Sequence, residues 1–555
     1  MRRYLLKVVV GLALLATMAY LIGTFSPYPE MKNLPLYTLT TVWRIFFTLI
    51  ISVAWGVSFG ILAATNKTAG RIITPIVDIL QSIPILGYFP LAIGFLYAWG
   101  AWGIEISVIL LLFTSMAWAI FFGVLGAISS IPANVVDSSK SFGIKGWKYT
   151  RHIVIPAIAP AVVSGANLAW SDGWFFMIAA EYVQYQQKVV SPPSGGVGFL
   201  LAQAAYYYKD MNLAIILLVF ITILVIIINS LTWHKLMDKA NTGTFKPILS
   251  IDLSGVGKLV AAEESSILTF SNIHRPKGFS AIYQRLRQYS RWEKIIVWFV
   301  LGGLLTYFMV TAYEHFPTLS IVQQGLSSPP AEQLGNLPML ILFTMGRLTL
   351  AYVISLVVAI GLGVLAAESK RAASLIYPIY DIGQGVPILA LFPVIYLGLT
   401  GVVGSQRLAL EITCIVMLVL DMIWYMFINV TSAIKNIPSE IKEVGSIFGF
   451  KGLHRITHLI IPSILPAIVT GSILSWGTGW NTIIFSEYLQ STEPGVLPVS
   501  VPGLGSLLDQ ASYTYGNTIV LLFLLVIICI IVLSMEGLIW RRLIRRFEKY
   551  KVEVG

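Results

Sequence analysis

The sequence predicts an all-α integral membrane protein with about twelve transmembrane helices in two parallel, homologous six-helix halves. The first observation behind this prediction is composition: the chain is 57% hydrophobic and 11% charged, whereas a soluble domain carries about 25% charged residues. The second is a series of apolar runs, each of about 20 residues and thus long enough to cross a bilayer core as a helix. The third is an internal repeat.

The repeat relates residues 1–233 to residues 294–555. Pro75 to Pro90 reads PIVDILQSIPILGYFP and Pro378 to Pro393 reads PIYDIGQGVPILALFP, with 10 of 16 positions identical. The similarity extends over most of each half, so the chain is a fused pair of homologous units and not an array of short repeats. Such units build a pseudo-twofold body, and we expect a path or site at their interface.

Six spans are expected in each half. Because six is even, both halves enter the membrane in the same orientation. The spans are expected to begin near Leu5, Leu36, Ile73, Ile104, Ala157, Leu213, Ile295, Leu337, Ala373, Leu408, Ser463 and Asn517. The first run, after Met1-Arg-Arg, could be a secretory signal, but an equivalent run after Arg291 at mid-chain favours a retained span.

Charge predicts the orientation. With both termini in the cytoplasm, 31 of the 37 lysines and arginines fall on the cytoplasmic side, as the positive-inside rule requires. The formal net charge of +11 then reflects topology and attraction to anionic membrane lipid, without nucleic acid as a partner.

The polar stretch 234–293 is expected to be a cytoplasmic linker. It is a tether or, from Gly278 to Glu293, an amphipathic helix on the membrane surface. No Gly-x4-Gly-Lys-Ser/Thr phosphate loop occurs in the chain, so we expect no ATP hydrolysis by it. Cys414 and Cys529 lie in apolar spans and are expected to be packing residues. Neither a catalytic cluster nor a metal site is predicted.

The loop between the fourth and fifth spans carries a pattern that occurs twice. Asp137 and Glu443 are each followed after six positions by glycine, Gly143 and Gly449. Proline follows 13 positions later, another proline after four more, and glycine after five more. This order predicts a short cytoplasmic helix, a glycine turn, a basic segment and a span that begins at proline.

This pattern resembles the EAA loop of membrane subunits of binding-protein-dependent ABC importers. In that family the loop forms a coupling helix that docks into a groove of the ATPase subunit. The resemblance implies that the residues contacting the ATPase are Asp137, Ser138, Ser139, Gly143, Glu443, Val444, Gly445 and Gly449. Val444 is bulkier than the alanine usual there, so the two docking sites are expected to differ.

Further motifs resemble the nitrate, sulfonate and bicarbonate branch of these permeases. They are Asp78, Gln81, Pro84, Arg44, Glu105 and Glu181, with their repeats Asp381, Gln384, Pro387, Arg347, Glu411 and Glu487. The resemblance implies a prokaryotic inner membrane, two ATPase subunits that bind ATP and Mg, and an extracytoplasmic solute-binding protein. No cofactor is expected on this chain, and the cargo is expected to be a small anion or small organic solute.

The fifth and eleventh spans are the predicted lining of the substrate path. Trp170, Trp174 and Glu181 are spaced to share one helix face, and Trp476, Trp480 and Glu487 repeat the arrangement. Asn481 and Asp172 break this symmetry, as an asymmetric substrate would require. The alternative is that the tryptophans only fill the bundle core. In that case the lining would lie on the helices of Gln81 and Gln384.

Arg44 and Arg347 are predicted inside the membrane, where a charge needs a polar cavity or a partner. They could form an electropositive vestibule for an anion, or ion pairs with Glu105, Asp78 or the repeats of these residues. The alternative function for the whole chain is a twelve-span carrier driven by an ion gradient. Asp172 and Asp421 are the main candidates for its proton site, and neither is repeated.

Overall fold

The computed structural model describes residues 2–241, 329–489 and 499–547, apart from residues 130, 132, 145, 186, 187 and 436. Two predicted segments therefore lie outside the described residues: most of the linker 234–293, and the span expected from near Ile295. The described chain is almost entirely helical, with two short antiparallel hairpins.

Each half is a series of helices in which short 3-10 or π-helical pieces, labelled η, follow or precede α-helices. The elements of the first half are α1 (Arg2–Phe25), η1 (Pro29–Asn33), α2 (Leu34–Thr65), α3 (Lys67–Ser82), α4 (Ile85–Leu96), η2 (Tyr97–Trp99), α5 (Gly100–Ser129), α6 (Ala133–Ser141), α7 (Trp147–Tyr149), η3 (Thr150–Val154), α8 (Ile155–Glu181), β1 (Val183–Tyr185), β2 (Lys188–Val190), α9 (Val197–Ala202), η4 (Gln203–Tyr207) and α10 (Met211–Asn241).

The second half repeats this order. Its described elements are α15 (Pro329–Glu332), η5 (Gln333–Asn336), α16 (Leu337–Glu368), α17 (Lys370–Gly385), α18 (Ile388–Val403), α19 (Gln406–Lys435), α20 (Ser439–Ile447), α21 (Gly452–Arg455), η6 (Ile456–Ile460), α22 (Ile461–Ser486), β3 (Tyr488–Leu489), β4 (Val499–Ser500), α23 (Leu504–Asp509), η7 (Gln510–Thr514), α24 (Thr518–Met535), η8 (Glu536–Trp540) and α25 (Arg541–Phe547).

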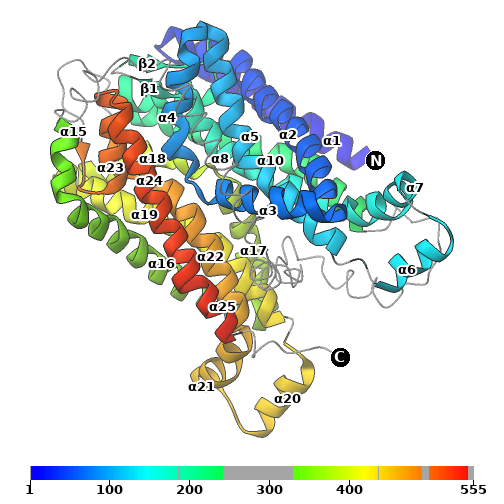
Figure 1. The fold of residues 1–555 in the computed structure, drawn as a ribbon. Helices are drawn as coiled ribbons and strands as arrows, with labels where there is room; N and C mark the ends of the chain where they lie inside the picture. The colour runs from blue at the N-terminus through cyan, green and yellow to red at the C-terminus, as the bar shows by residue number, and fades with distance from the viewer. Residues whose placement is uncertain are drawn as a thin grey trace.

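The repeat in the sequence is a repeat in the structure (Figure 1). Helices α2 and α16 both have 32 residues and begin 303 positions apart, at Leu34 and Leu337. Helices α8 and α22 begin 306 positions apart, at Ile155 and Ile461. Even the π-helical segments η3 and η6 occupy matching places just before these two helices. The prediction of two homologous helical halves is confirmed.

Eight helices of the described residues are long and apolar enough to cross a membrane. They are Pro29–Thr65, Gly100–Ser129, Trp147–Glu181, Met211–Asn229, Pro329–Glu368, Gln406–Lys435, Ile456–Ser486 and Thr518–Trp540. Three shorter apolar helices, Ala13–Phe25, Ile85–Gly94 and Ile388–Val403, accompany them. The chain is therefore a multi-pass membrane protein.

The spans expected from near Ile73 and Ala373 are wrong as continuous helices. The first is broken between α3 and α4, where Ile83 is extended (φ −79°, ψ 125°) and Pro84 follows. Proline disfavours the helical conformation in the residue before it, so the chain bends here. Helix α4 has 12 residues and a length of about 18 Å, too short to cross a 30 Å hydrocarbon core. Helices α17 and α18 repeat this break before Pro387.

Within each half, three long helices form the centre: α2, α5 and α8 in one, and α16, α19 and α22 in the other. Small residues bring them close together, as is usual where helices meet in lipid. A Cβ atom on Gly60 of α2 would lie 2.8 Å from the Val124 side chain of α5. The matching Gly363 of α16 stands in the same relation to Val430 of α19.

The broken helices join the two halves. Helix α4 contacts α22, α24 and η7 of the second half, and α18 reciprocally contacts α8, α10 and η4 of the first. One continuous cluster of buried apolar side chains includes residues of both halves, among them Phe89 of α4 and Phe392 of α18. The interface between the halves is thus built around two short helices that the sequence pattern alone did not separate.

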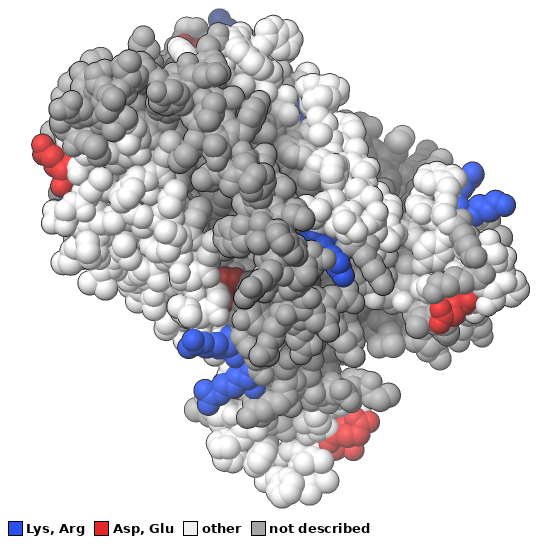
Figure 2. Space-filling model, in the orientation of Figure 1, with Lys and Arg blue, Asp and Glu red and all other residues white. Residues whose placement is uncertain are grey.

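The two ends of the bundle differ. In Figure 1, helices α6, α7, α20 and α21 project at one end, where α1 also begins and α25 lies, whereas β1 and β2 lie at the opposite end. The space-filling view shows a broad band of uncharged described surface between these ends, and most of the visible blue side chains near the projecting loops (Figure 2). This distribution is expected of a protein with an apolar belt and one basic face.

Candidate functional site

The two projecting loops have the same backbone. Gly143 follows α6 and Gly449 follows α20, each with φ of +70°, in the left-handed region that favours glycine. The amide of Ile144 donates to the carbonyl of Ser139 at 2.9 Å, and Phe450 donates to Gly445 in the same way at 2.9 Å. These are the bonds of a helix that ends in a Schellman motif, so the glycine turn predicted from the spacing is present in both loops.

The acidic-small-small triplets divide between two faces of these helices. Ser139 is buried, and a Cβ on the matching Gly445 would lie 2.1 Å from the side chain of Leu459. The third position must therefore be small because it packs against this chain. Asp137, Ser138 and Glu443 are exposed, and Val444 is 50% exposed. The bulk of Val444 therefore projects away from this chain, and its effect on a docking partner stays a prediction.

Large apolar side chains are exposed on these loops outside the apolar belt. Phe142 is 77% exposed and Trp147 is 70% exposed in the first loop, and Ile447 and Phe448 are 81% and 71% exposed in the second. Exposed apolar groups gathered beside charged ones are typical of a surface that binds another protein.

Arg44 lies in a buried cluster of charges near the hairpin end of the first half. Its guanidinium is 4% exposed and forms two hydrogen bonds with Glu105, at 2.8 and 2.9 Å, and one with Glu181, at 2.8 Å. The carbonyl of Gly195 and the hydroxyl of Ser194 accept the remaining two donors. All five N–H donors of Arg44 are thereby used.

The second half contains the same cluster. Arg347 binds Glu411 at 2.7 and 2.8 Å, Glu487 at 2.7 Å and the Pro502 carbonyl at 2.8 Å. Thr344 donates to Glu487 at 2.8 Å, just as Thr41 donates to Glu181 at 2.7 Å in the first half. Of the alternatives left open by the sequence, the ion pair with Glu105 is the one present, and Asp78 instead accepts from Gln81.

These clusters fasten the hairpin region to the long helices. The amide of Gly198 in α9 donates to Glu181 at 2.8 Å, and Gly505 in α23 donates to Glu487 at 2.8 Å. A Cβ on Gly196 would lie 2.0 Å from the Glu181 carboxyl carbon, so glycine is required by close approach. Arg44, Arg347, Glu181 and Glu487 are thus held within the protein by their partners, and a role for them in the substrate path stays a prediction.

The four predicted tryptophans are all buried, with 2–6% of their surface exposed. Trp170 contacts Trp174 and Trp233 and donates to Asn229 at 3.0 Å, so it packs against α10 of its own half. Trp476 packs against Tyr352 and Trp540 of the second half. No ring contact joins the tryptophans of the two halves in the described part of the chain, and their place in the path stays a prediction.

Asn481, predicted to line the path, has a defined partner in the other half. Its side-chain oxygen accepts from the amide of Ile85 at 2.7 Å. Ile85 is the first residue of α4, whose N-terminal amides lack partners within the helix. The matching position in the first half is Phe175, which cannot form this bond. Asn481 therefore fixes the start of one broken helix.

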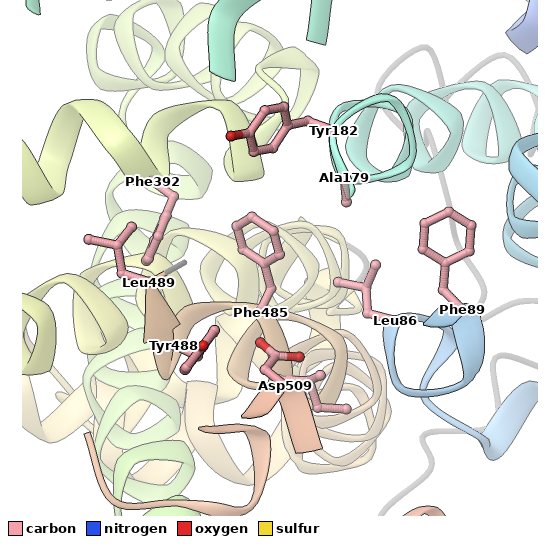
Figure 3. Close-up of a pocket in the computed structure, with 10 residues that line it drawn as sticks. Leu86, Phe89, Ala179, Tyr182, Phe392, Phe485, Tyr488, Leu489 and Asp509 are labelled. Carbon is pink, nitrogen blue, oxygen red and sulfur yellow. The ribbon is translucent and has the colours of Figure 1, made fainter. Parts of the chain in front are cut away.

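A pocket between the halves contains residues that sequence reasoning missed (Figure 3). The volume that water can enter is about 30 Å³, room for one or two molecules. Short helices contribute Leu86, Phe89 and Phe392, and the ends of α8 and α22 contribute Ala179, Ile484 and Phe485. The pocket is completed by Tyr182, Tyr488, Leu489 and Asp509. The sequence feature that could have pointed to these residues is the Pro-Ile-Leu and Phe-Pro pattern of the third span, which recurs in the second half.

Comparison with known proteins gives the family. Residues 56–241 and 359–546 match the family described as "Binding-protein-dependent transport system inner membrane component". A taurine transport system permease protein of Escherichia coli is 23% identical over 208 residues, which are 35% of this chain and 71% of that protein.

Two other relatives extend the comparison. A nitrate import permease protein of Synechococcus elongatus is 24% identical over 173 residues, 31% of this chain and 57% of that protein. A glycine betaine transport system permease protein of Bacillus subtilis is 29% identical over 187 residues, 33% and 60% of the two chains. Since the family match covers more than half of the chain and occurs once in each half, this protein belongs to the binding-protein-dependent ABC importer permeases, as a fusion of two such units.

Proposed function

We propose that this chain forms the complete translocation pathway of an ATP-driven importer. Two cytoplasmic ATPase subunits dock on its two loops, and an extracytoplasmic solute-binding protein delivers cargo to the hairpin end. The observation that carries this proposal is the pair of matching loops, each with an exposed acidic residue beside exposed aromatic or aliphatic side chains. Two matching loops on one pseudo-twofold body would provide two docking sites for ATPase subunits. A carrier driven by an ion gradient has no ATPase partner and needs no such loops.

The loops are suited to transmit motion. Each short helix leads through a glycine turn and a π-helical segment directly into α8 or α22. The buried Ser139 and Gly445 hold the loop against this chain, while the neighbouring carboxylates face outward. ATP and Mg would be bound by the partner, whose movement would displace α8 and α22 and change access to the path between them.

The cargo class follows from the relatives as a proposal. Their names include taurine, nitrate and glycine betaine, which agrees with a small anion or small organic solute. Both termini are proposed to be cytoplasmic, because the loops that would meet the ATPases lie at the same end as the start of α1 and as α25 (Figure 1).

The test is to reverse the charge of both loops. The full chain with Asp137→Arg and Glu443→Arg is purified by a tag from its cell membranes, and the nucleotide hydrolysis that co-purifies is measured. We expect co-purifying hydrolysis and solute uptake to fall at least tenfold, equivalent to about 1.4 kcal/mol of binding. The matched control is Glu332→Arg, the same change on exposed α15 away from the loops.

Unchanged hydrolysis and uptake in the double variant would contradict the proposed docking sites. An equal loss in the Glu332→Arg control would show that the effect is not specific to the loops. Membrane insertion is followed by the yield of full-length chain, because a folding defect would lower yield and hydrolysis together.

A further inference from the structure

Asp509 breaks the symmetry of the pocket between the halves. The aromatic residues of the short helices, Phe89 and Phe392, are equivalent, and so are Tyr182 and Tyr488. Helices α9 and α23 also align: they begin at Val197 and Leu504, and each has six residues. The position of Asp509 in this alignment is Ala202 in the first half. The second half thus places a carboxyl group in the pocket from a position at which the first half has a methyl group.

This carboxylate is buried without a partner. Asp509 is 4% exposed, and within the described residues no side chain or amide donates a hydrogen bond to it and no cation pairs with it. The nearby Glu487 carboxylate opposes its charge, while Arg347 is already occupied by Glu487 and Glu411. Because a buried charge with no partner is strongly unfavourable, burial and the nearby Glu487 raise the pKa of the Asp509 carboxyl well above its usual value. A cation bound beside Asp509 would supply the partner that its ionised form lacks within the described residues.

The rest of the pocket suits a cation. Figure 3 shows Asp509 between the labelled side chains of Tyr488 and Leu86, while the ring of Phe485 is paired with that of Phe392, 5.3 Å between ring centroids. Five of the ten lining residues are aromatic, none is basic, and Asp509 is the only one with a carboxylate. Aromatic faces attract cations, and an anion placed here would meet no positive charge among the ten lining residues. A volume of about 30 Å³ fits a group as small as an ammonium.

The interface between the halves contains two more carboxylates with no ion pair. Asp421 of α19 accepts from Thr482 at 2.8 Å and lies near Asp172 of α8, which is hydrogen-bonded to Tyr425. Neither carboxylate pairs with a lysine or arginine in the described part of the chain. Carboxyl groups without a cationic partner therefore recur along the contact between the described parts of the two halves, independently of Asp509.

We propose that the pocket at Asp509 binds the primary ammonium group of a small organic solute, cationic or zwitterionic. This inference rests on the proposed function, because it names the chemistry of the cargo in that path. It narrows the expected cargo: a simple inorganic anion has no group that would complete the Asp509 site.

Ligand-induced stabilisation of the purified full chain in lipid nanodiscs tests the proposal. The midpoint of thermal unfolding is measured against the concentration of ethylammonium chloride. Ethanol is the neutral probe of similar size, and sodium chloride and sodium methanesulfonate control for ionic strength and for an anion. We expect ethylammonium to raise the midpoint and the other probes to leave it unchanged.

Asp509→Asn keeps the shape of the side chain and should raise the apparent Kd for ethylammonium at least tenfold. Asp509→Ala introduces alanine, the residue found at the equivalent position 202 of the first half, and should also raise the apparent Kd for ethylammonium at least tenfold. Glu332→Gln, an exposed carboxylate elsewhere, is the matched control with unchanged affinity. Equal stabilisation by methanesulfonate, or an unchanged Kd in Asp509→Asn, would overturn the proposal.

If neither Asp509 variant folds, the variant Phe485→Leu tests whether the pocket binds a cation. It removes a ring and keeps the carboxylate, so it should weaken ethylammonium binding several-fold, and an unchanged Kd would be decisive against a cation site. The proposed importer function is tested separately from the ammonium site by measuring nucleotide hydrolysis in the same wild-type preparation, where it reports co-purified ATPase subunits. If hydrolysis is present but ethylammonium has no effect, the ammonium site is wrong and the importer function stands.

Discussion

At the scale of single residues, the strongest constraint is the pair of buried arginines. Each guanidinium bridges a carboxylate on the long helix beside it and a carboxylate at the end of α8 or α22. The arginines and the carboxylates at the ends of α8 and α22 are at most 5% exposed, whereas Glu105 and Glu411 are 21% and 35% exposed. The buried groups therefore depend on their partners for the hydrogen bonds that water would otherwise provide. Removing one partner of such a network leaves a buried charge unpaired, which costs about 3–5 kcal/mol.

Arg347→Met is therefore expected to destabilise the second half severely. It leaves Glu411 and Glu487 without their cation, and the loss should be about 3–5 kcal/mol, visible as a large fall in the midpoint of thermal unfolding in nanodiscs. Arg455→Met is the comparison, because Arg455 and Glu368 form a half-exposed pair at 3.1 Å. That change should cost about 1 kcal/mol or less. Similar midpoints for the two variants would refute this account.

An ion pair could be predicted from the sequence where both of its residues lie in motifs that occur in each half. Arg44 with Glu105 was one of the alternatives open from the sequence, because an intramembrane arginine needs a carboxylate and Glu105 recurs with it. The addition of Glu181 could not be derived, because it depends on how the end of α8 meets α2. The unpartnered state of Asp509 was equally invisible, since it follows from the packing of α23 beside Glu487.

At the scale of elements, the broken helices α4 and α18 position the pocket. The sequence shows a proline at each break, but the apolar residues continue through it, so average hydropathy suggests a single span. The deviation arises because Ile83 before Pro84 is extended, and the second piece then turns into the other half. The loops between α5 and α8, by contrast, were predictable in detail, since a left-handed turn at Gly143 and Gly449 leaves few alternatives to glycine.

Asn481→Ala should loosen the start of α4. The bond from the Ile85 amide to the Asn481 side chain, 2.7 Å long, acts as a helix cap supplied by the other half, and a cap is worth about 0.5–2 kcal/mol. Amide hydrogen exchange of peptides covering residues 85–89 should accelerate by about 2- to 30-fold.

Peptides covering residues 388–392 of the same variant are the internal control. They begin α18, whose start faces no equivalent asparagine because the matching residue is Phe175. Equal acceleration in both peptides would indicate general loosening of the interface, and no acceleration at 85–89 would show that the bond does not hold α4.

At the scale of the whole molecule, the two ends of the bundle differ in the residues they carry. One carries basic side chains and the exposed apolar loops, and the other carries the hairpins and the buried arginine clusters. Lysine and arginine counts predict that the end with the loops faces the cytoplasm, because the translocation of positive charge is disfavoured, and this orientation stays a prediction. The interleaving of α4 and α18 between halves was not predictable, since a repeat shows that two units exist and not which helices they exchange.

Cysteine labelling tests the orientation. In a background with Cys414→Ala and Cys529→Ala, single cysteines replace exposed Glu332 of α15 and exposed Lys451 between α20 and α21. An impermeant thiol reagent applied to intact cells should label position 332 and leave position 451 unlabelled until the cells are opened. The reverse pattern would invert the topology and remove the loops from the cytoplasm.

Because α4 and α18 each pack against the other half, the fusion of the two halves into one polypeptide affects how their interface can change. If two identical chains formed this interface, every substitution would be present twice, and an acquired carboxylate at position 509 would confront its own copy across the axis. With both units in one polypeptide, a change is introduced once. Phe175 and Ala202 can stay apolar in one half while Asn481 and Asp509 are polar in the other, so the two halves can present different side chains at equivalent positions of one interface.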